Sequence, residues 1–298
     1  MRLDDAPESE NVDDRRGMGG KLAVGGGLGG LVIVVLGLLF GVDLRGKLPV
    51  APPNNDGGES RGAAPNDGYK QFAGKILGMT EEVWAEQFKT NGYKSYKKPK
   101  MVLFSRGVRT GCGDAPSSVG PFYCPADETV YLDPTFFDEL EQKLKGSKAE
   151  FSQAYVVGHE VGHHVQHLLG YSRRTDEMRK TKRENEYSIR LELQADYLAG
   201  VWSNHADKKY KILQRGDVEE ALKTARSIGD NRIQEKMRGR VHPESFNHGT
   251  DRQRYAAFSD GLKTGDASKK KLDLYFDDEQ TPFDARAGEL RNPTLFGR

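Results

Sequence analysis

The sequence predicts a mainly helical α+β domain with a small sheet, preceded by one transmembrane helix. Helix-forming segments follow one another from residue 69 to residue 262, whereas only two short stretches have the β-branched and aromatic composition of strands. Both stretches precede most of the helices, which favours an α+β arrangement. An uncharged, apolar run lies ahead of this whole region.

The uncharged run, Leu22–Val42, contains seven glycines and as a helix would measure about 31 Å, close to the thickness of a bilayer core. A cleaved signal peptide is the alternative, although only Pro49-Val50-Ala51 resembles a cleavage site. Basic residues are slightly more frequent before the run than after it. We therefore expect residues 1–21 in the cytoplasm and the domain outside the inner (cytoplasmic) membrane. Glycines four residues apart would let two such helices approach closely, which suggests a homodimer.

Residues 43–68 are rich in Pro, Asn, Gly and Ser and predict a flexible linker. The folded domain is expected over residues 69–264, which is long enough for one buried core, and residues 265–298 are expected to form a loose tail. Within the domain we expect, in chain order, helices 69–77 and 80–90, strands 100–105 and 129–133, and helices 134–144, 151–169, 184–204, 216–229 and 250–262.

The cysteines bear on the redox compartment of the protein, and the net charge bears on its binding partners. Cys112 and Cys124 are the only cysteines and enclose a turn-rich stretch. In an oxidising compartment they could close a small loop as a disulfide, and two free thiols are the alternative. The net charge of +1 gives no basic excess, so we expect no nucleic-acid partner.

The predicted helix 151–169 carries an H-E-x-x-H pattern, His159-Glu160-Val161-Gly162-His163. Residues four apart share one face of a helix, so His159 and His163 can bind the same ion. Glu160 lies beside them, where a carboxylate can act on a water bound to that ion. A surface helix that is merely rich in histidine is the alternative, although all seven histidines fall between residues 159 and 248.

A catalytic zinc site usually has three protein ligands and one open position for water. Glu192 and Asp196 are four residues apart on the next long predicted helix, among apolar neighbours. We expect Glu192 to be the third ligand and Asp196 to accept the N–H of a ligating histidine. His205, His242 and Asp196 itself are the other candidates for the third ligand.

Two stretches, HEVGHHVQHLLG (159–170) and ELQADYLAG (192–200), resemble the membrane-anchored neutral zinc metallopeptidases of bacteria, a family of the gluzincin group. The resemblance covers most of the chain apart from the residues near 50–67 and the far C-terminus. It implies a zincin-like metalloprotease domain with His159, His163 and Glu192 as ligands of one zinc ion per chain. It continues through the glycine-rich apolar run and through NVDDRRG (11–17), GPFYCPAD (120–127), VYLDPTFFDEL (130–140), GDVEEALKTARSIGDNRIQ (216–234) and PESFNHGTDRQR (243–254).

From these residues and this resemblance we expect a membrane-anchored zinc endopeptidase that hydrolyses peptide bonds of protein or peptide substrates, with Glu160 as general base. We expect His248 to donate a hydrogen bond to the negative charge that develops on the substrate oxygen. The other candidate donors are His242, Arg252 and Arg254.

The short strand 129–133 is expected at an edge of the sheet, where it could pair with an extended peptide; an ordinary core strand is the alternative. Two other functions fit the same residues. The zinc site could be structural or catalytically inactive in a membrane-tethered scaffold or binding protein, or it could hydrolyse an amide bond outside peptides. A structural site has no need of a base at Glu160, which favours the enzyme.

Overall fold

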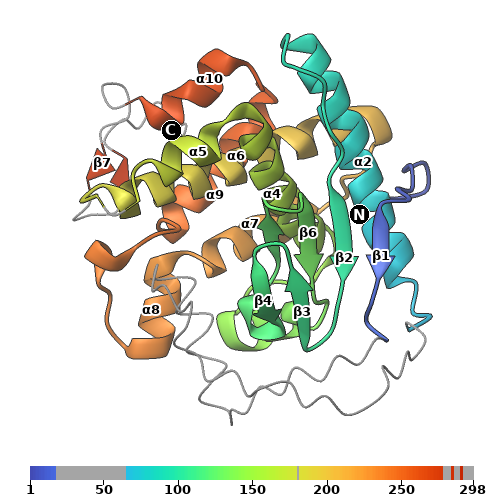
Figure 1. The fold of residues 1–298 in the computed structure, drawn as a ribbon. Helices are drawn as coiled ribbons and strands as arrows, with labels where there is room; N and C mark the ends of the chain where they lie inside the picture. Colours follow the sequence, from blue (N-terminus) through green and yellow to red (C-terminus); the bar gives the residue numbers. More distant parts are fainter. Residues whose placement is uncertain (18–64, 180, 278–282, 285–288, 291–298) are drawn as a thin grey trace.

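The structure, a computed structural model, describes residues 1–17, 65–179, 181–277, 283–284 and 289–290. Over these residues the fold is mainly helical with a small sheet, as the sequence predicts (Figure 1). The expected membrane helix at 22–42, the homodimer contact through its glycines and most of the expected linker lie outside the described residues. Within the described residues, no helix combines the length and apolar character needed to cross a membrane.

The main sheet has four strands in the order β1-β2-β6-β5, formed by Val12–Asp14, Lys100–Leu103, Thr129–Leu132 and Phe122–Cys124. The first three are parallel, and β5 runs antiparallel to β6. Every residue of β6 is buried, because helices cover one face of the sheet and a hairpin of β3 (Gly107–Thr110) and β4 (Gly113–Pro116) lies against the other.

The expectation that strand 129–133 lies at a sheet edge is wrong. β6 has β2 on one side and β5 on the other, so both of its edges are already paired. The edge on that side is formed instead by β5, the strand that directly precedes β6 in the chain and ends at Cys124.

The helices form most of the core. α6 packs against both α4 and α9, and Tyr155, Trp202 and Phe258 of these helices are fully buried. Two glycines of α4 permit this close packing: a Cβ at Gly162 would lie 3.0 Å from the Ala195 carbonyl oxygen of α6. The helices are α2 (Tyr69–Thr90), α3 (Phe136–Glu139) with a π-helical extension (Leu140–Leu144), α4 (Glu150–Leu169), α5 (Tyr171–Asp176), α6 (Glu184–Tyr210), α7 (Asp217–Ser227), α8 (Asp230–Arg238), α9 (Asp251–Thr264) and α10 (Lys269–Asp273).

Several predicted boundaries differ from the structure. The two helices predicted before residue 90 are one continuous helix, α2. The helix predicted at 216–229 ends at Ser227, and α8 follows it after a two-residue break. Part of the predicted loose tail is packed on the domain, because α10 and the 3₁₀ turn Leu274–Phe276 bury Leu272, Tyr275 and Phe276. A short two-stranded sheet, β7 (Phe283–Asp284) and β8 (Glu289–Leu290), lies beyond them.

The N-terminal residues belong to the domain rather than to a separate segment. β1 is an outer strand of the main sheet, and Val12 is buried in the main core. Residues 12–14 thus belong to the same sheet as the strands of the domain expected at residues 69–264. This strand could not be predicted, because three residues reading Val-Asp-Asp have neither the length nor the alternation of a typical strand.

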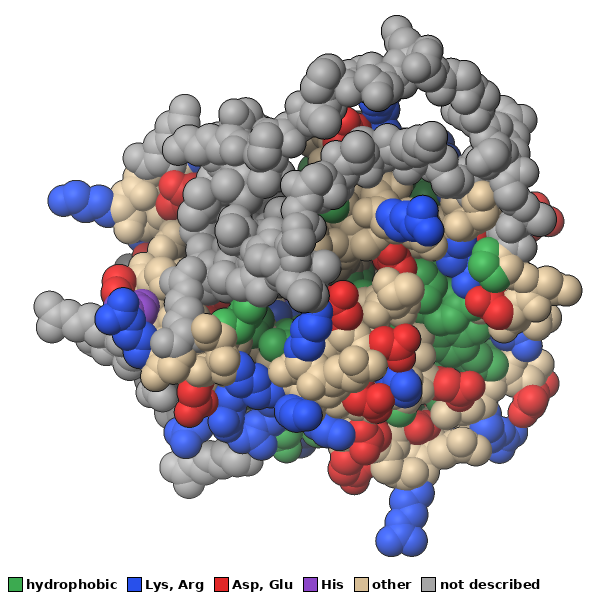
Figure 2. Space-filling model, turned by 90° about the horizontal axis from the view of Figure 1, so that it is seen from below, with side chains coloured by type: hydrophobic (Ala, Val, Ile, Leu, Met, Phe, Trp, Pro, Cys, Tyr) green, Lys and Arg blue, Asp and Glu red, His purple; other side chains and the backbone are tan. Residues whose placement is uncertain are grey.

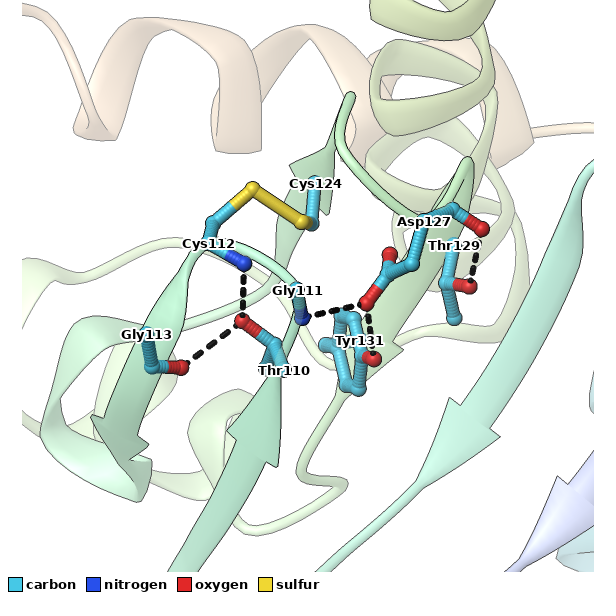
Figure 3. Close-up of a disulfide and its surroundings, with 8 residues drawn as sticks. All are labelled: Thr110, Gly111, Cys112, Gly113, Cys124, Asp127, Thr129 and Tyr131. Carbon is cyan, nitrogen blue, oxygen red and sulfur yellow. Dashed lines mark hydrogen bonds between the residues drawn. A yellow bond between two sulfur atoms is a disulfide. The ribbon is translucent and has the colours of Figure 1, made fainter.

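The predicted disulfide between Cys112 and Cys124 is confirmed (Figure 3). It joins the β3–β4 turn to the end of β5. The same turn is held by hydrogen bonds that Asp127 accepts from the Gly111 backbone N–H (2.7 Å) and from the Tyr131 hydroxyl (2.8 Å). The edge strand β5 is therefore fixed covalently to the hairpin beside it.

Replacing both cysteines with serine should lower the free energy of unfolding. The bridged residues are 12 positions apart, and closing a loop of about this length stabilises a protein by roughly 3 kcal/mol through the unfolded chain. Urea unfolding of the wild type and of the Cys112→Ser/Cys124→Ser variant, each with and without a reductant, would measure the loss. Reductant should destabilise only the wild type. Equal unfolding curves for the wild type and the variant in the absence of reductant would contradict the prediction.

The surface carries charges of both signs. Figure 2 shows Lys and Arg side chains gathered at one side of the face seen from below, with Asp and Glu side chains spread over the rest of it. This mixture agrees with the near-zero net charge of the chain.

Candidate metal centre

Three side chains from two helices converge on one point. His159 and His163 lie one turn apart on α4, and Glu192 faces them from α6; their candidate ligand atoms all lie within 4.8 Å of one another. The Glu192 carboxylate oxygens lie 3.3 Å from His159 Nε2 and 3.4 Å from His163 Nε2. Zinc–ligand bonds of about 2.05 Å would place neighbouring ligands of a tetrahedral ion roughly 3.3 Å apart. The three residues could therefore hold a metal ion.

The electrostatics of the cluster favour a cation. Burial opposes a charged imidazole at His159, but Asp196 and Glu192 outweigh it and raise the pKa of this histidine to about 10. Burial likewise opposes ionisation of Glu192, yet His163 and His248 keep the pKa of its carboxyl well below the usual range. The carboxylates of Asp196 and Glu192, which favour a proton on His159, would also favour a divalent cation beside this histidine.

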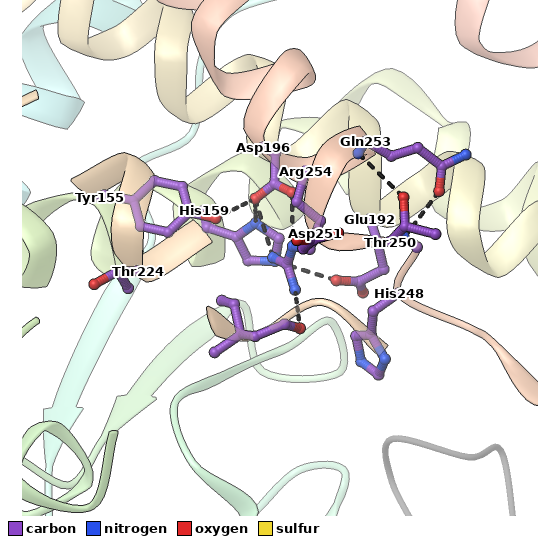
Figure 4. A network of polar contacts seen from close by, with 12 residues as sticks. Tyr155, His159, Glu192, Asp196, Thr224, His248, Thr250, Asp251, Gln253 and Arg254 are labelled. Carbon is purple, nitrogen blue, oxygen red and sulfur yellow. Dashed lines mark hydrogen bonds and ion pairs between the residues drawn. The ribbon is translucent and has the colours of Figure 1, made fainter. Parts of the chain in front are cut away.

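Asp196 orients the first histidine through a buried network (Figure 4). His159 Nδ1 donates to Asp196 Oδ1 (2.9 Å), which leaves Nε2 to face Glu192. The same carboxylate accepts a hydrogen bond from the Tyr155 hydroxyl (2.6 Å) and two from Arg254 (2.8 and 3.0 Å). Burial raises the pKa of Asp196, but Arg254 and His159 lower it further, so this residue is a carboxylate. A partner of this kind fixes the tautomer of a ligating histidine.

An amide orients the second histidine. His163 Nδ1 donates to Gln166 Oε1 (2.8 Å), and Gln166 Nε2 donates to the Leu191 carbonyl (2.6 Å) and to Gln194 Oε1 (3.0 Å). Both histidines thus present Nε2 to the cluster. The sequence analysis missed Gln166, although its position three residues after His163 places it on the same helix face.

Glu160 is adjacent to the cluster but not part of it. Its side chain is 7% exposed, and within the described residues its carboxylate makes no hydrogen bond. Burial raises the pKa of this carboxyl, and the neighbouring histidines only partly offset the effect. A desolvated carboxylate without a fixed partner, next to a candidate metal position, is suited to accept a proton.

His248 lies next to the cluster on the loop before α9, close enough for its charge to act on Glu192. Its Nδ1 lies 3.3 Å from Asp230 Oδ1, although the two atoms are not aligned as a hydrogen bond. The other oxygen of Asp230 accepts the backbone N–H groups of residues 247, 248 and 249. Asp230 thus fixes the loop that carries His248, a role that the sequence analysis missed.

The competing candidates lie elsewhere. His205 contacts the Gly265 carbonyl (2.8 Å), and His242 contacts Glu244 (3.1 Å), so neither reaches the cluster. Arg254 is fully engaged by Asp196 and the Ile228 carbonyl, and Arg252 is exposed beside a cavity of about 390 Å³.

Comparisons with known proteins agree with this chemistry. The model of a family described as "Putative neutral zinc metallopeptidase" matches residues 1–271. The chain is 43% identical over 283 residues to "Uncharacterized protein YpfJ" of Escherichia coli (strain K12), an alignment that covers 90% of this chain and 97% of that protein. It is 39% identical over 247 residues to "Uncharacterized protein Rv2575" of Mycobacterium tuberculosis (strain ATCC 25618 / H37Rv), covering 77% and 82%. No solved structure gives a significant match.

Proposed function

The chain belongs to this neutral zinc metallopeptidase family, and from that premise we propose that it is a zinc-dependent endopeptidase with a zincin-like catalytic domain. The observation that carries the proposal is the conjunction of two features on α4. Two histidines whose Nδ1 atoms are already engaged present Nε2 to Glu192, and an unpaired carboxylate, Glu160, stands beside them.

The residues fit zinc by their donor chemistry. Two neutral imidazole nitrogens and one carboxylate oxygen leave a fourth tetrahedral position open, as in catalytic zinc sites. Bound there, zinc would lower the pKa of a water molecule and polarise the carbonyl group of a substrate.

The protein's own residues would then move the protons and hold the charge. Glu160 would accept a proton from the attacking water and pass it to the leaving amine. His248, on the loop fixed by Asp230, would donate a hydrogen bond to the developing oxyanion of the substrate. Asp196 and Gln166 would hold the two histidines in one orientation throughout.

The outer edge of β5, which no described strand pairs with, would align a peptide substrate. β5 is the last strand of the main sheet and lies against α4, where the Tyr123 hydroxyl contacts His164 Nδ1 (2.9 Å). His164 Nε2 donates to the Lys97 carbonyl, so this histidine braces the strand on the metal-site helix. An extended peptide that added to this edge would bind through backbone hydrogen bonds, largely independent of its sequence. A position for an extended chain favours peptide substrates over isolated amides.

Metal analysis of the purified full-length protein tests the proposal. We expect about one zinc ion per chain, lost in Glu192→Ala because two imidazoles alone hold the ion weakly. Glu86→Ala, an exposed glutamate on α2, is the matched control and should keep its metal. Hydrolysis of an unfolded protein by the zinc-loaded wild type would complete the case. Metal bound without any hydrolysis would favour a structural site, and metal retained in Glu192→Ala would refute the ligand assignment.

A further inference from the structure

We infer that residues 1–17 and the metal centre lie on the same side of any membrane that this chain contacts. The first evidence is β1, which lies parallel to β2 and in register with it. Backbone hydrogen bonds hold both of its ends: Met101 N–H donates to the Asn11 carbonyl (2.9 Å), and Arg15 N–H donates to the Leu103 carbonyl (2.8 Å). β2 is buried, so removing β1 would leave its backbone groups without partners inside the protein.

The second evidence is a set of contacts with α2 that only this segment provides. Glu81 is 3% exposed and accepts hydrogen bonds from Ser9 Oγ (2.6 Å) and Asn11 Nδ2 (2.7 Å). Gly78 faces the backbone of Pro7 so closely that a Cβ would overlap its carbonyl group. α2 is thus shaped to receive residues 7–11, which supply the hydrogen bonds to Glu81 Oε1, while Lys98 pairs with Oε2 (2.8 Å).

The third evidence is the position of the two points where the described chain breaks off and resumes. Arg16 is 5% exposed and forms a paired contact with Asp67, from Nη1 to Oδ2 (2.7 Å) and from Nη2 to Oδ1 (3.0 Å), and a second with Asp14. The described chain therefore breaks off just after Arg16 and resumes just before Asp67 at one place.

A single membrane crossing between these residues would hold them about 30 Å apart, the thickness of the bilayer core. Two crossings would return the chain to the same side but need about 40 apolar residues, and only Leu22–Val42 is available. A second copy could not supply β1, because its own N-terminus would also lie across the membrane. The expected orientation, with the N-terminus inside and the domain outside, is therefore incompatible with the folded domain. This inference does not depend on the proposed function.

Labelling of single cysteines in intact cells tests the inference on the full-length protein. Glu10→Cys reports on the N-terminal segment, and Lys263→Cys on α9 reports on the domain; both native side chains are exposed. The wild type, whose natural cysteines are joined as a disulfide, is labelled in parallel, and its signal is subtracted as background. Glu86→Cys on α2 is a second domain position that must agree with Lys263→Cys. Each variant is treated with a membrane-impermeant maleimide before and after permeabilisation, and the labelled fraction is normalised to that of the denatured protein.

We expect Glu10→Cys and the two domain variants to be labelled to the same fraction under each condition. Labelling of all three in intact cells would place them outside the cytoplasm, as the disulfide suggests. Labelling of all three only after permeabilisation would place them inside. Labelling of Glu10→Cys and the domain variants under opposite conditions would overturn the inference.

Discussion

Glu160→Gln should reduce kcat/KM for peptide hydrolysis by about 10²- to 10⁴-fold, the range expected for loss of a general base, while the protein keeps its zinc. The amide has nearly the shape of the carboxylate but cannot accept the proton. Metal content should not change, because Glu160 lies outside the group of candidate ligands. Steady-state kinetics and elemental analysis on the same preparation would measure both quantities.

Glu150→Gln provides the control for this substitution. Glu150 is an exposed glutamate in the first turn of the same helix, far from the cluster in sequence. It should leave both kinetics and metal content unchanged. Undiminished hydrolysis by Glu160→Gln would refute the proposed mechanism, and loss of zinc would mean that Glu160 is itself a ligand.

Arg254→Leu should have the largest effect on stability. Arg254 donates two hydrogen bonds to Asp196, and both side chains are almost completely buried. Removing one member of a buried ion pair leaves the other charge uncompensated and typically costs about 3–5 kcal/mol. Urea unfolding of metal-free protein would measure this loss. The affinity for zinc should fall as well, because Asp196 orients His159.

Arg252→Leu, an exposed arginine two positions earlier, is the matched control and should change stability by less than about 0.5 kcal/mol. The pH dependence adds a second check. The pKa of Asp196 is lowered in the folded state, so its ionic interactions contribute above the usual carboxyl range and are lost as the pH falls through that lowered value. The difference between wild type and Arg254→Leu should therefore shrink on acidification. Equal stability of the two arginine variants would contradict the role given to Arg254.

Relations between residues that lie close together in the chain could be predicted from the sequence. The pair His159 and His163 is defined by helical spacing within one element, and the same spacing relates Glu192 to Asp196. The contact between these two pairs, by contrast, depends on how the two helices pack in the tertiary structure. The structure achieves it through the close approach of α4 and α6 at Gly162, which the sequence alone could suggest only through the resemblance to a family.

The features that were not predicted depend on contacts between residues that are distant in the sequence. Asp230 acts on a loop 17 to 19 residues away, and no periodic pattern marks such a relation. The interior position of β6 follows from its pairing with both β2 and β5, which local propensity does not define. The packed tail could have been recognised, because Leu272, Tyr275 and Phe276 have the three- and four-residue spacing of a buried helix face.

The placement of β1 also has a consequence for the order of folding. The residues synthesised first pair with residues far along the chain: β1 pairs with a strand almost 90 residues later, and Arg2 N–H donates to the Ile212 carbonyl (2.8 Å). Contacts of such long sequence separation form slowly. Until β1 has docked, β2 would present an unpaired edge of the kind that promotes aggregation. A fragment that begins at Tyr69 would keep that edge exposed permanently, so recombinant production should retain the first 17 residues.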